Sequence, residues 1–326
     1  LVGKKTSKKI IENLLENENN VIKNPKSFFD NEWYYYKIMS KNERLKSLNE
    51  NYGDLSTDEL KKLSKLFKQV FKKNFSYKFL DWLYNKNPNG PALTYNASYD
   101  EDIIGHYALI PIKIKLNQKE HNAALSVFTA IDKEYRGLYL FNKLAKKTFE
   151  LAKNKGIKYI IGVSNQISTK LFIRYFNFKL ISQLDVKFGI GDVKKIKTSS
   201  QFEVAWDDKS LFWRLQNPRF NYEIYNLKEK FCVYNNYYKL FKIQLGEFNN
   251  INFSNVLENY SNKTNFRLFN LWIGLGHYDW KNSLYFNFPE KLKPAPLNFI
   301  IKNISDEKDE VILDKKDVEF QLIDFD

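Results

Sequence analysis

The sequence predicts an α/β protein in which a mixed, mostly antiparallel sheet is flanked by helices. The first observation is the order of segments between residues 55 and 190: two helices, three strands, then a helix, a strand and a helix. The second is a short motif that recurs beyond residue 200 and indicates a duplicated unit. The composition agrees with a folded chain, because 43% of the 326 residues are hydrophobic and 17% are aromatic.

Local signals at the beginning of the chain place the first helices. Residues 1–54 are polar and are expected to form a partly helical extension. Ser56 and Glu59 have the spacing of a capping box, in which each side chain satisfies a backbone donor of the other. Apolar residues at helical spacing from Leu60 to Phe71 then form one stripe on a helix. A second helix, YKFLDWLY, ends at the breaker run NKNPNGP.

Strands and helices then alternate toward the middle of the chain. Three strands are predicted at 92–97, at 103–116 with a break at Pro111, and at 123–131. A helix at 138–155, a strand at 159–165 and a helix at 168–176 follow. Gly156 follows the long helix directly, and a glycine there is typical of a helix end in the left-handed conformation.

A repeated motif divides the chain. The segment Phe79–Pro88 is echoed by Ser210–Pro218, because both contain a Trp in an aromatic helix, end in Asn-Pro and run into a strand. We therefore expect the extension at 1–54, a first lobe at 55–200 and a second, related lobe at 201–326.

Charge suggests which partners the protein has. Fifty-two Lys and Arg residues against 38 Asp and Glu give a formal net charge of +14, which would suit a polyanion. Only 6 of the cations are Arg, however, and the lysines are scattered along the chain. We therefore expect no nucleic-acid partner, whereas an anionic small substrate is compatible with this surface.

The sequence also predicts a compartment. Cys232 is the single cysteine and cannot form an intrachain disulfide, which is typical of a reducing environment. No run of 18 apolar residues is present, and the first residues lack the apolar middle of a signal peptide. We therefore expect a cytoplasmic protein with no membrane span.

The turn at Arg136-Gly137 joins a predicted strand directly to a helix. The first amides of a helix have no internal partners and lie at the positive end of its dipole, so such a turn suits a pyrophosphate. An ordinary connection with Arg136 in solvent would have the same pattern.

The residues around this turn resemble the GNAT superfamily of acyl-CoA-dependent N-acyltransferases. The resemblance covers residues 55–190 and rests on Glu134-Tyr135-Arg136-Gly137 with Leu140, Phe141 and Leu144 in the next helix, on Lys155-Gly156-Ile157, on Asn165, and on Phe176-Asn177-Phe178. Arg136 fills the first position of the family's Arg/Gln-x-x-Gly-x-Gly/Ala motif, whereas Tyr139 and Phe141 stand in place of its two glycines.

The resemblance implies an acyl-CoA site without a metal. The turn would hold the pyrophosphate, and the pantetheine arm would pair with the preceding strand as an added strand does. The cofactor-binding residues that it implies are Phe128, Thr129, Ala130, Ile131, Arg136, Gly137, Leu138, Tyr139, Leu140, Phe141, Asn165 and Phe172. Three scattered histidines and one cysteine have no recurring zinc spacing.

The implied reaction is direct transfer, in which an amine attacks the thioester with the help of a base and an acid. His106 is the expected base, because histidine titrates near neutrality, and a structural histidine is the alternative. The position of the family's Tyr acid falls on Phe172 or Ile173, which cannot donate a proton. Tyr175 is the substitute candidate, with a packing role as the alternative.

The second lobe has no counterpart of the Arg136 turn and is therefore expected to shape the acceptor pocket. His277, Tyr278 and Trp280 are the expected acceptor wall, with a core cluster as the alternative. The end of the chain resembles two-lobed GNAT proteins of surface-polysaccharide and lipopolysaccharide biosynthesis. This implies the amino group of a nucleotide-linked deoxyamino sugar as acceptor. A peptide or aminoacyl acceptor, or a CoA-binding module without catalysis, are the alternatives.

Overall fold

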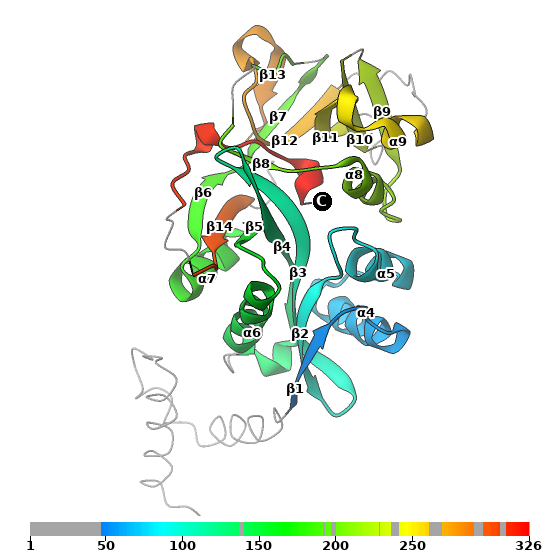
Figure 1. Ribbon diagram of the computed structural model, residues 1–326, viewed down its shortest axis with the longest axis vertical. Coiled ribbons are helices and arrows are strands. Elements are labelled where there is room, and N and C mark those ends of the chain that lie inside the picture. Colours follow the sequence, from blue (N-terminus) through cyan, green and yellow to red (C-terminus); the bar gives the residue numbers. More distant parts are fainter. Residues whose placement is uncertain are drawn as a thin grey trace, which may run out of the picture.

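Two mixed sheets flanked by helices make up the part of the chain that the structure describes (Figure 1). This computed structural model describes residues 47–136, 140–191, 193–196, 200–227, 229–235, 241–260, 269–289, 296–306 and 311–325. The predicted extension lies outside these ranges up to residue 46. Gly137, Leu138 and Tyr139, three of the expected CoA-binding residues, also lie outside them.

The first sheet has the strand order β1-β2-β3-β4-β5-β14-β6, and β8 pairs with β3. The bounds are β1 Ser47–Tyr52, β2 Leu93–Tyr99, β3 Asp102–Leu116, β4 Lys119–Ile131, β5 Tyr159–Ser164, β14 Asn298–Asn303, β6 Lys179–Gln183 and β8 Phe202–Val204. Among the paired strands described here, β4 and β5 form the one parallel pair of this sheet, and the other pairs are antiparallel.

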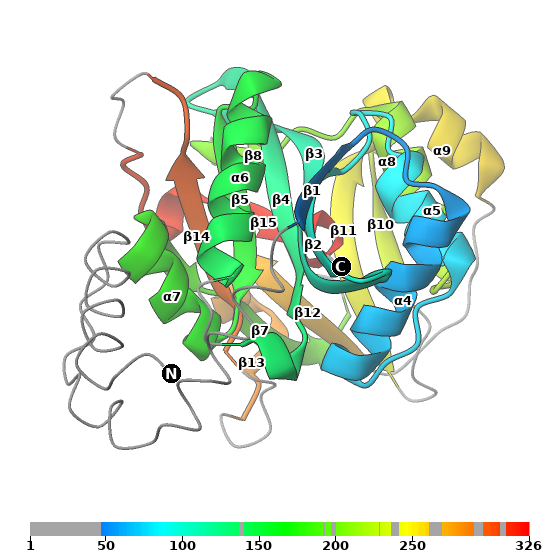
Figure 2. The same cartoon turned by 90° about the horizontal axis from the view of Figure 1, so that it is seen from below.

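Helices cover both faces of the first sheet (Figures 1 and 2). Helices α4 (Thr57–Phe71) and α5 (Tyr77–Asn85) pack on one face, and α6 (Leu140–Asn154) and α7 (Gln166–Phe176) pack on the other. Alternation along β3 explains this, because Ala108 and Ile110 join the α4–α5 core while Tyr107 and Leu109 join the α6–α7 core. The predicted α/β class and its mixed, mostly antiparallel sheet are confirmed.

Two helix ends lie where local signals in the sequence predict them. Ser56 Oγ accepts from the Glu59 amide and Glu59 Oε2 accepts from the Ser56 amide, so the capping box is formed. Gly156 follows α6 with φ +78°, the left-handed conformation that a glycine at a helix end adopts readily.

The predicted break at Pro111 is wrong, because β3 runs through it. Beyond Leu109 β2 no longer pairs with β3, so the missing N–H of Pro111 removes no bond to β2.

The second sheet repeats the first. Its order is β13-β7-β12-β11-β10-β9, and β15 pairs with β12. The bounds are β13 Leu284–Asn287, β7 Asp185–Ile190, β12 Phe269–Leu275, β11 Phe241–Asn249, β10 Lys230–Asn235, β9 Tyr222–Leu227 and β15 Phe320–Gln321, with helices α8 (Asp208–Leu215) and α9 (Ser254–Asn259). The run from β9 to β12 has two antiparallel pairs followed by a parallel one, as the run from β2 to β5 has. This agrees with the predicted duplication.

The two repeats meet at equivalent tryptophans. Trp82 of α5 and Trp213 of α8 stack with ring centroids 4.8 Å apart, and both are almost fully buried. Trp82 Nε1 donates to the carbonyl of Trp213 at 2.9 Å, and Trp213 Nε1 donates to the carbonyl of Trp82 at 3.1 Å. Because each residue plays the same role toward the other, a local two-fold relation joins the lobes.

Residue 200 does not separate the two sheets, although the sequence placed a lobe boundary there. Strand β7 precedes residue 200 but lies in the second sheet, and β14 follows it but lies in the first. Strand β14 fills the place between β5 and β6, so the first sheet is completed by a distant part of the chain.

We predict that the two tryptophans are energetically coupled. Trp82→Ala and Trp213→Ala should each lower the free energy of unfolding by about 3 kcal/mol through the lost burial and the cavity left behind. The double variant should lose about 1 kcal/mol less than the sum, because the two rings contact each other. Urea unfolding measures this cycle. A control cycle of Trp82→Ala with Phe299→Ala, on β14, should be additive within about 0.5 kcal/mol. Additivity of the tryptophan pair would contradict the coupling.

Candidate functional site

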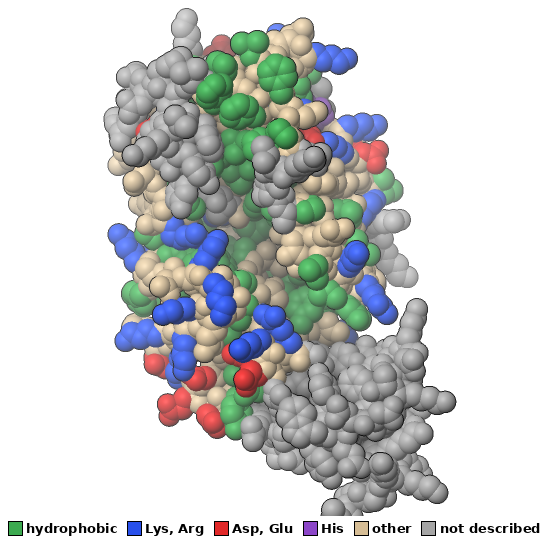
Figure 3. Space-filling model, turned by 180° about the vertical axis from the view of Figure 1, so that it is seen from behind, with side chains coloured by type: hydrophobic (Ala, Val, Ile, Leu, Met, Phe, Trp, Pro, Cys, Tyr) green, Lys and Arg blue, Asp and Glu red, His purple; other side chains and the backbone are tan. Residues whose placement is uncertain are grey.

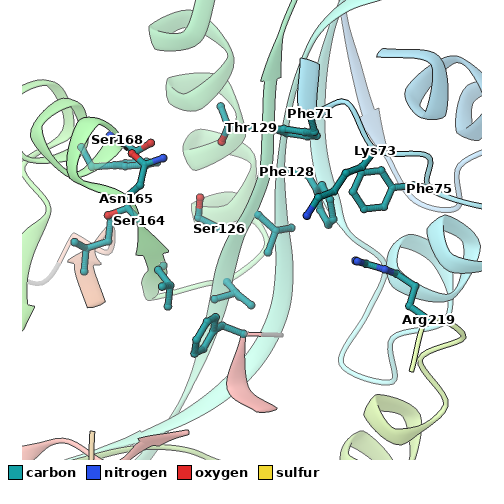
Figure 4. Close-up of a pocket in the computed structure, with 17 residues that line it drawn as sticks. Phe71, Lys73, Phe75, Ser126, Phe128, Thr129, Ser164, Asn165, Ser168 and Arg219 are labelled. Carbon is teal, nitrogen blue, oxygen red and sulfur yellow. Dashed lines mark hydrogen bonds between the residues drawn. The ribbon is translucent and has the colours of Figure 1, made fainter. Parts of the chain in front are cut away.

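A cavity of about 560 Å³ lies where the two parallel strands of the first sheet separate (Figure 4). Ser126 with Gly162 is the last register pair of β4 and β5, although β4 continues to Ile131. Beyond this pair the backbone of β4 has no partner in β5. The residues that line the cavity are Phe71, Lys73, Phe75, Leu125, Ser126, Val127, Phe128, Thr129, Gly162, Val163, Ser164, Asn165, Ser168, Phe172, Arg219, Ile300 and Phe325.

A β-bulge shapes the β4 wall of this cavity. Ala130 pairs with His106 and Val127 with Ala108, so β4 holds one more residue than β3 over this stretch. Phe128 lies in the bulge with φ +48°, a left-handed conformation that is rare for a residue other than glycine. Its ring centroid lies 5.2 Å from that of Phe67 and 5.1 Å from that of Phe75. This aromatic packing offsets the backbone strain and fixes the bulge at the site.

Polar groups gather on the α7 side of the cavity. The side-chain oxygen of Asn165 caps α7 by accepting from the Ser168 amide at 2.9 Å. The Asn165 Nδ2 donor makes no hydrogen bond within the described ranges. The Ser164 hydroxyl is held by Thr169 at 2.7 Å, and Ser126 Oγ is 2.7 Å from the hydroxyl of the buried Tyr107. Because the Thr169 hydroxyl donates to the Asn165 carbonyl, the Ser164 hydroxyl donates to Thr169, so this side offers the Asn165 Nδ2 donor and the Ser126 hydroxyl to a polar ligand.

Two cations stand on the other side, near α4 and α5. Lys73 follows α4, and Arg219 follows α8 of the second lobe. Figure 3 shows a hollow in the middle of the rear face, with Lys and Arg side chains gathered beside it over the α4 side. The exposed lysines of this region are Lys61, Lys65, Lys68, Lys72 and Lys73.

The structure brings four of the expected cofactor residues to the cavity, namely Phe128, Thr129, Asn165 and Phe172. The other described ones lie elsewhere: Ala130 is buried against α4 and α5, while Ile131, Leu140 and Phe141 pack in the α6–α7 core. Arg136 is exposed, and its Nε donates to the Ile131 carbonyl at 3.3 Å. It lines a second cavity of about 520 Å³ together with Lys65 and Lys72.

His106 lies in the interior and lines none of the cavities described here. It has no exposed surface, its Nε2 is 2.7 Å from the Tyr84 hydroxyl, and its Nδ1 is 2.6 Å from Oδ1 of Asn96. An amide oxygen only accepts, so Nδ1 carries the proton and Nε2 accepts from Tyr84. Burial lowers the pKa of His106 to about 3. Both ring nitrogens are occupied, and His106 therefore has the geometry of a structural histidine.

Tyr175 and the expected acceptor wall also lie away from the cavity. Tyr175 is on the outer face of α7, where Arg174 covers its ring at 5.5 Å. Tyr278 and Trp280 pack with Trp272 and Tyr285 in a separate aromatic cluster of the second lobe, and burial raises the pKa of Tyr278 well above its usual value. His277 is next to this cluster and lines none of the three cavities.

Several residues that line the cavity lie outside the family motif and were not predicted. Lys73, Phe75, Arg219 and Phe325 come from loops and from the last described residues. One signal was present for Arg219, because it follows the second copy of the Asn-Pro motif, at the place where Asn89 follows the first. Both copies form the same turn, with Asn87 Oδ1 accepting from the Asn89 amide and Asn217 Oδ1 from the Arg219 amide.

Two features are absent from the part of the chain that the structure describes. None of the helices is long and apolar enough to cross a membrane. No group of three or more His, Cys, Asp or Glu side chains has the arrangement of a metal site in this part of the chain.

We predict a pH-dependent stability that His106 carries. In the unfolded chain its pKa is 6.5 and in the folded protein about 3, so the unfolded state binds more protons between these values and stability is lost as the pH falls below 6.5. From pH 8 to pH 5, wild type should lose about 2 kcal/mol relative to His106→Gln. Asp324 acts in the opposite direction, because burial raises its pKa to about 7, so the variant comparison is needed.

Urea unfolding at both pH values provides the measurement. His121→Gln, which removes a half-buried histidine of β4, is the control and should keep the wild-type dependence. An equal pH dependence in wild type and His106→Gln would mean that His106 is not buried in the neutral form.

Most of the first lobe is similar to a known domain family. Residues 51–180 match the family model described as an acetyltransferase (GNAT) domain. A putative glycylpeptide N-tetradecanoyltransferase of Amsacta moorei entomopoxvirus is 30% identical over 172 residues, which are 50% of this chain and 55% of that protein. The chain thus spans about half the length of this curated relative.

Solved structures extend the likeness in fold to both lobes. A probable N-acyltransferase of Enterococcus faecalis has a TM-score of 0.53 at 11% identity, covering 78% of this chain and 73% of that one. A GCN5-related N-acetyltransferase of Kribbella flavida has a TM-score of 0.52 at 9% identity, with 78% and 71% covered. The predicted resemblance is supported for residues 51–180, which match an acetyltransferase (GNAT) domain, and these solved structures share the fold.

Proposed function

We propose that the protein transfers an acyl group from acyl-CoA to a primary amine by direct attack on the thioester. The observation that carries the proposal is the separation of β4 from β5 beyond Ser126 and Gly162 within a GNAT-type domain. The cavity formed there is lined from both faces of the sheet, so a donor and an acceptor can approach from opposite sides.

Two features support the binding of acyl-CoA on one side of the cavity: backbone groups of β4 that have no partner in β5, and oriented polar side chains. Strand β4 after Ser126 has no β5 partner, so the amides of a pantetheine arm can pair with it as an added strand would. Asn165 offers its Nδ2 donor from the beginning of α7. The pyrophosphate would lie close to Arg136 and the beginning of α6 at Leu140.

The proposed acyl transfer needs no cofactor other than acyl-CoA. The amine nitrogen forms a bond to the thioester carbonyl carbon, the C–S bond breaks, and the proton that the amine loses goes to the leaving thiolate. No Asp, Glu, His, Cys or Tyr of the described ranges lines the cavity, so water would carry this proton. The Ser126 hydroxyl, supported by Tyr107, lies at the point where the strands separate and would donate to the thiolate.

The acyl chain and the acceptor are the less constrained parts of the proposal. The lining of the cavity has more apolar than polar side chains, and the poxvirus relative is named as a tetradecanoyltransferase, which together support a longer acyl chain. The name of the poxvirus relative supports a peptide amino terminus as the first acceptor to test. A nucleotide-linked amino sugar, implied by the family resemblance, is the second, because Lys73 and Arg219 would suit its phosphates.

The proposed function predicts acceptor-dependent thiol release. Acetyl-CoA and tetradecanoyl-CoA are compared with a glycyl peptide and an amino-sugar nucleotide as acceptors, and the longer thioester should have the higher kcat/KM. Calorimetry measures CoA binding in parallel. Arg136→Glu should weaken binding about tenfold, because a charge near the pyrophosphate is reversed. Lys146→Glu, on the exposed face of α6, is the control and should bind as wild type does. CoA binding without thiol release for any acceptor would indicate a binding module instead of an enzyme.

The role of Ser126 has its own test. Ser126→Ala should lower kcat about tenfold and leave the KM for acyl-CoA unchanged, because the lost hydrogen bond would act on the leaving thiolate. Tyr107→Phe should have a smaller effect in the same direction, since Tyr107 acts through Ser126. Thiol-release kinetics measure both variants, and an unchanged kcat in Ser126→Ala would remove Ser126 from the mechanism.

A further inference from the structure

The charged side chains that line the cavity are both cations. Of the 17 residues that line it in the described part of the chain, Lys73 and Arg219 are charged, and none is Asp or Glu. Neither side chain forms an ion pair within the described ranges, whereas Lys62 and Lys65 of the neighbouring α4 pair with Asp58 and Asp102. The two cavity cations are therefore available to an anionic ligand.

Arg219 is held in place without a carboxylate. Asn217, which is 3% exposed, accepts from the Arg219 backbone amide at 3.1 Å and fixes the turn. The guanidinium lies 4.9 Å from the ring centroid of Phe79 and 5.2 Å from that of Phe75. Stacking of this kind orients a guanidinium and leaves its N–H donors for a second partner.

The position of the two cations assigns them to the acceptor and not to CoA. Figure 4 shows Lys73 and Arg219 pointing into the cavity from the α4–α5 side, opposite Asn165 and Ser168 of the α7 side. The proposed pantetheine path follows β4 and α7, and the proposed pyrophosphate site is close to Arg136 at the beginning of α6. An amine acceptor that enters from the α4–α5 face meets Lys73 and Arg219 on its way to the thioester.

We propose that the acceptor carries an anionic group, a carboxylate or a phosphate, close to its reactive amine, and that Lys73 and Arg219 bind this group. The inference rests on the proposed function and adds the substrate class to it. Arg219 comes from the second lobe and Lys73 from the first, so the selectivity requires both lobes. Where Arg219 stands in the second lobe, the first lobe has the neutral Asn89, and the charge is therefore specific to one copy of the repeat.

Matched acceptor pairs test this inference. One pair is the peptide amide Gly-Glu-Ala and its neutral counterpart Gly-Gln-Ala, and the other is glucosamine 6-phosphate and glucosamine. The anionic member of at least one pair should have a kcat/KM about tenfold higher, because a charge-assisted hydrogen bond contributes that much. The pair with the larger ratio identifies carboxylate or phosphate as the group.

Charge-neutral variants locate the effect. Arg219→Gln and Lys73→Gln should each reduce the ratio of kcat/KM for the anionic acceptor to kcat/KM for the neutral one about tenfold. The KM for the anionic acceptor should rise, and the KM for acyl-CoA should stay unchanged. The controls are Arg174→Gln on α7 and Lys78→Gln on α5, exposed cations that line none of the three cavities, and both should keep the wild-type ratio. An increase in the KM for acyl-CoA instead would assign the cations to the cofactor and overturn the inference.

Binding measurements separate this inference from the proposed function. Calorimetry of the same acceptors with the CoA-loaded protein reports recognition without turnover. Thiol release with equal kcat/KM for anionic and neutral acceptors would overturn the inference and leave the proposed function in place. Tighter binding of the anionic acceptors without any thiol release would support the inference and contradict the proposed function. Equal binding of both members of each pair would overturn the inference in either case.

Discussion

The separation of two parallel strands is the constraint on which the rest of the site depends. Strands β4 and β5 pair through Ser126 and Gly162 and no further, and the β4 bulge at Phe128 follows directly. The left-handed conformation of Phe128 persists because phenylalanine rings of α4 and of the loop after it surround its side chain. The packing of α4 on one face of the sheet thus stabilises the separation of β4 from β5, and the cavity formed there is lined from both faces.

Duplication gives the second lobe a part in this opening. The reciprocal contact of Trp82 and Trp213 places α8 beside α5, and the turn after α8 then reaches the cavity of the first lobe. The same Asn-Pro turn in the first lobe presents Asn89. The same kind of turn therefore presents a neutral side chain in one lobe and a cation in the other.

Local signals in the sequence predicted the elements, and contacts between distant segments decided the site. The capping box at Ser56 and the glycine at 156 act within a few residues, so they could be predicted. The burial of His106 depends on Tyr84 and Asn96, which come from other elements, so residue type suggested a base where the fold has a structural histidine. Lys73 and Arg219 are 146 positions apart, and no local pattern connects them.

The place of β14 has a consequence for how the protein is made. β5 and β6 are synthesised before Gln183, but the strand that lies between them begins at Asn298. At ribosomal rates of about 5–20 residues per second, the growing chain exposes two unpaired strand edges for roughly ten seconds. Exposed edges are templates for pairing with other chains. In the nascent first lobe these edges can therefore be covered by their native partner only after the segment that begins at Asn298 has emerged.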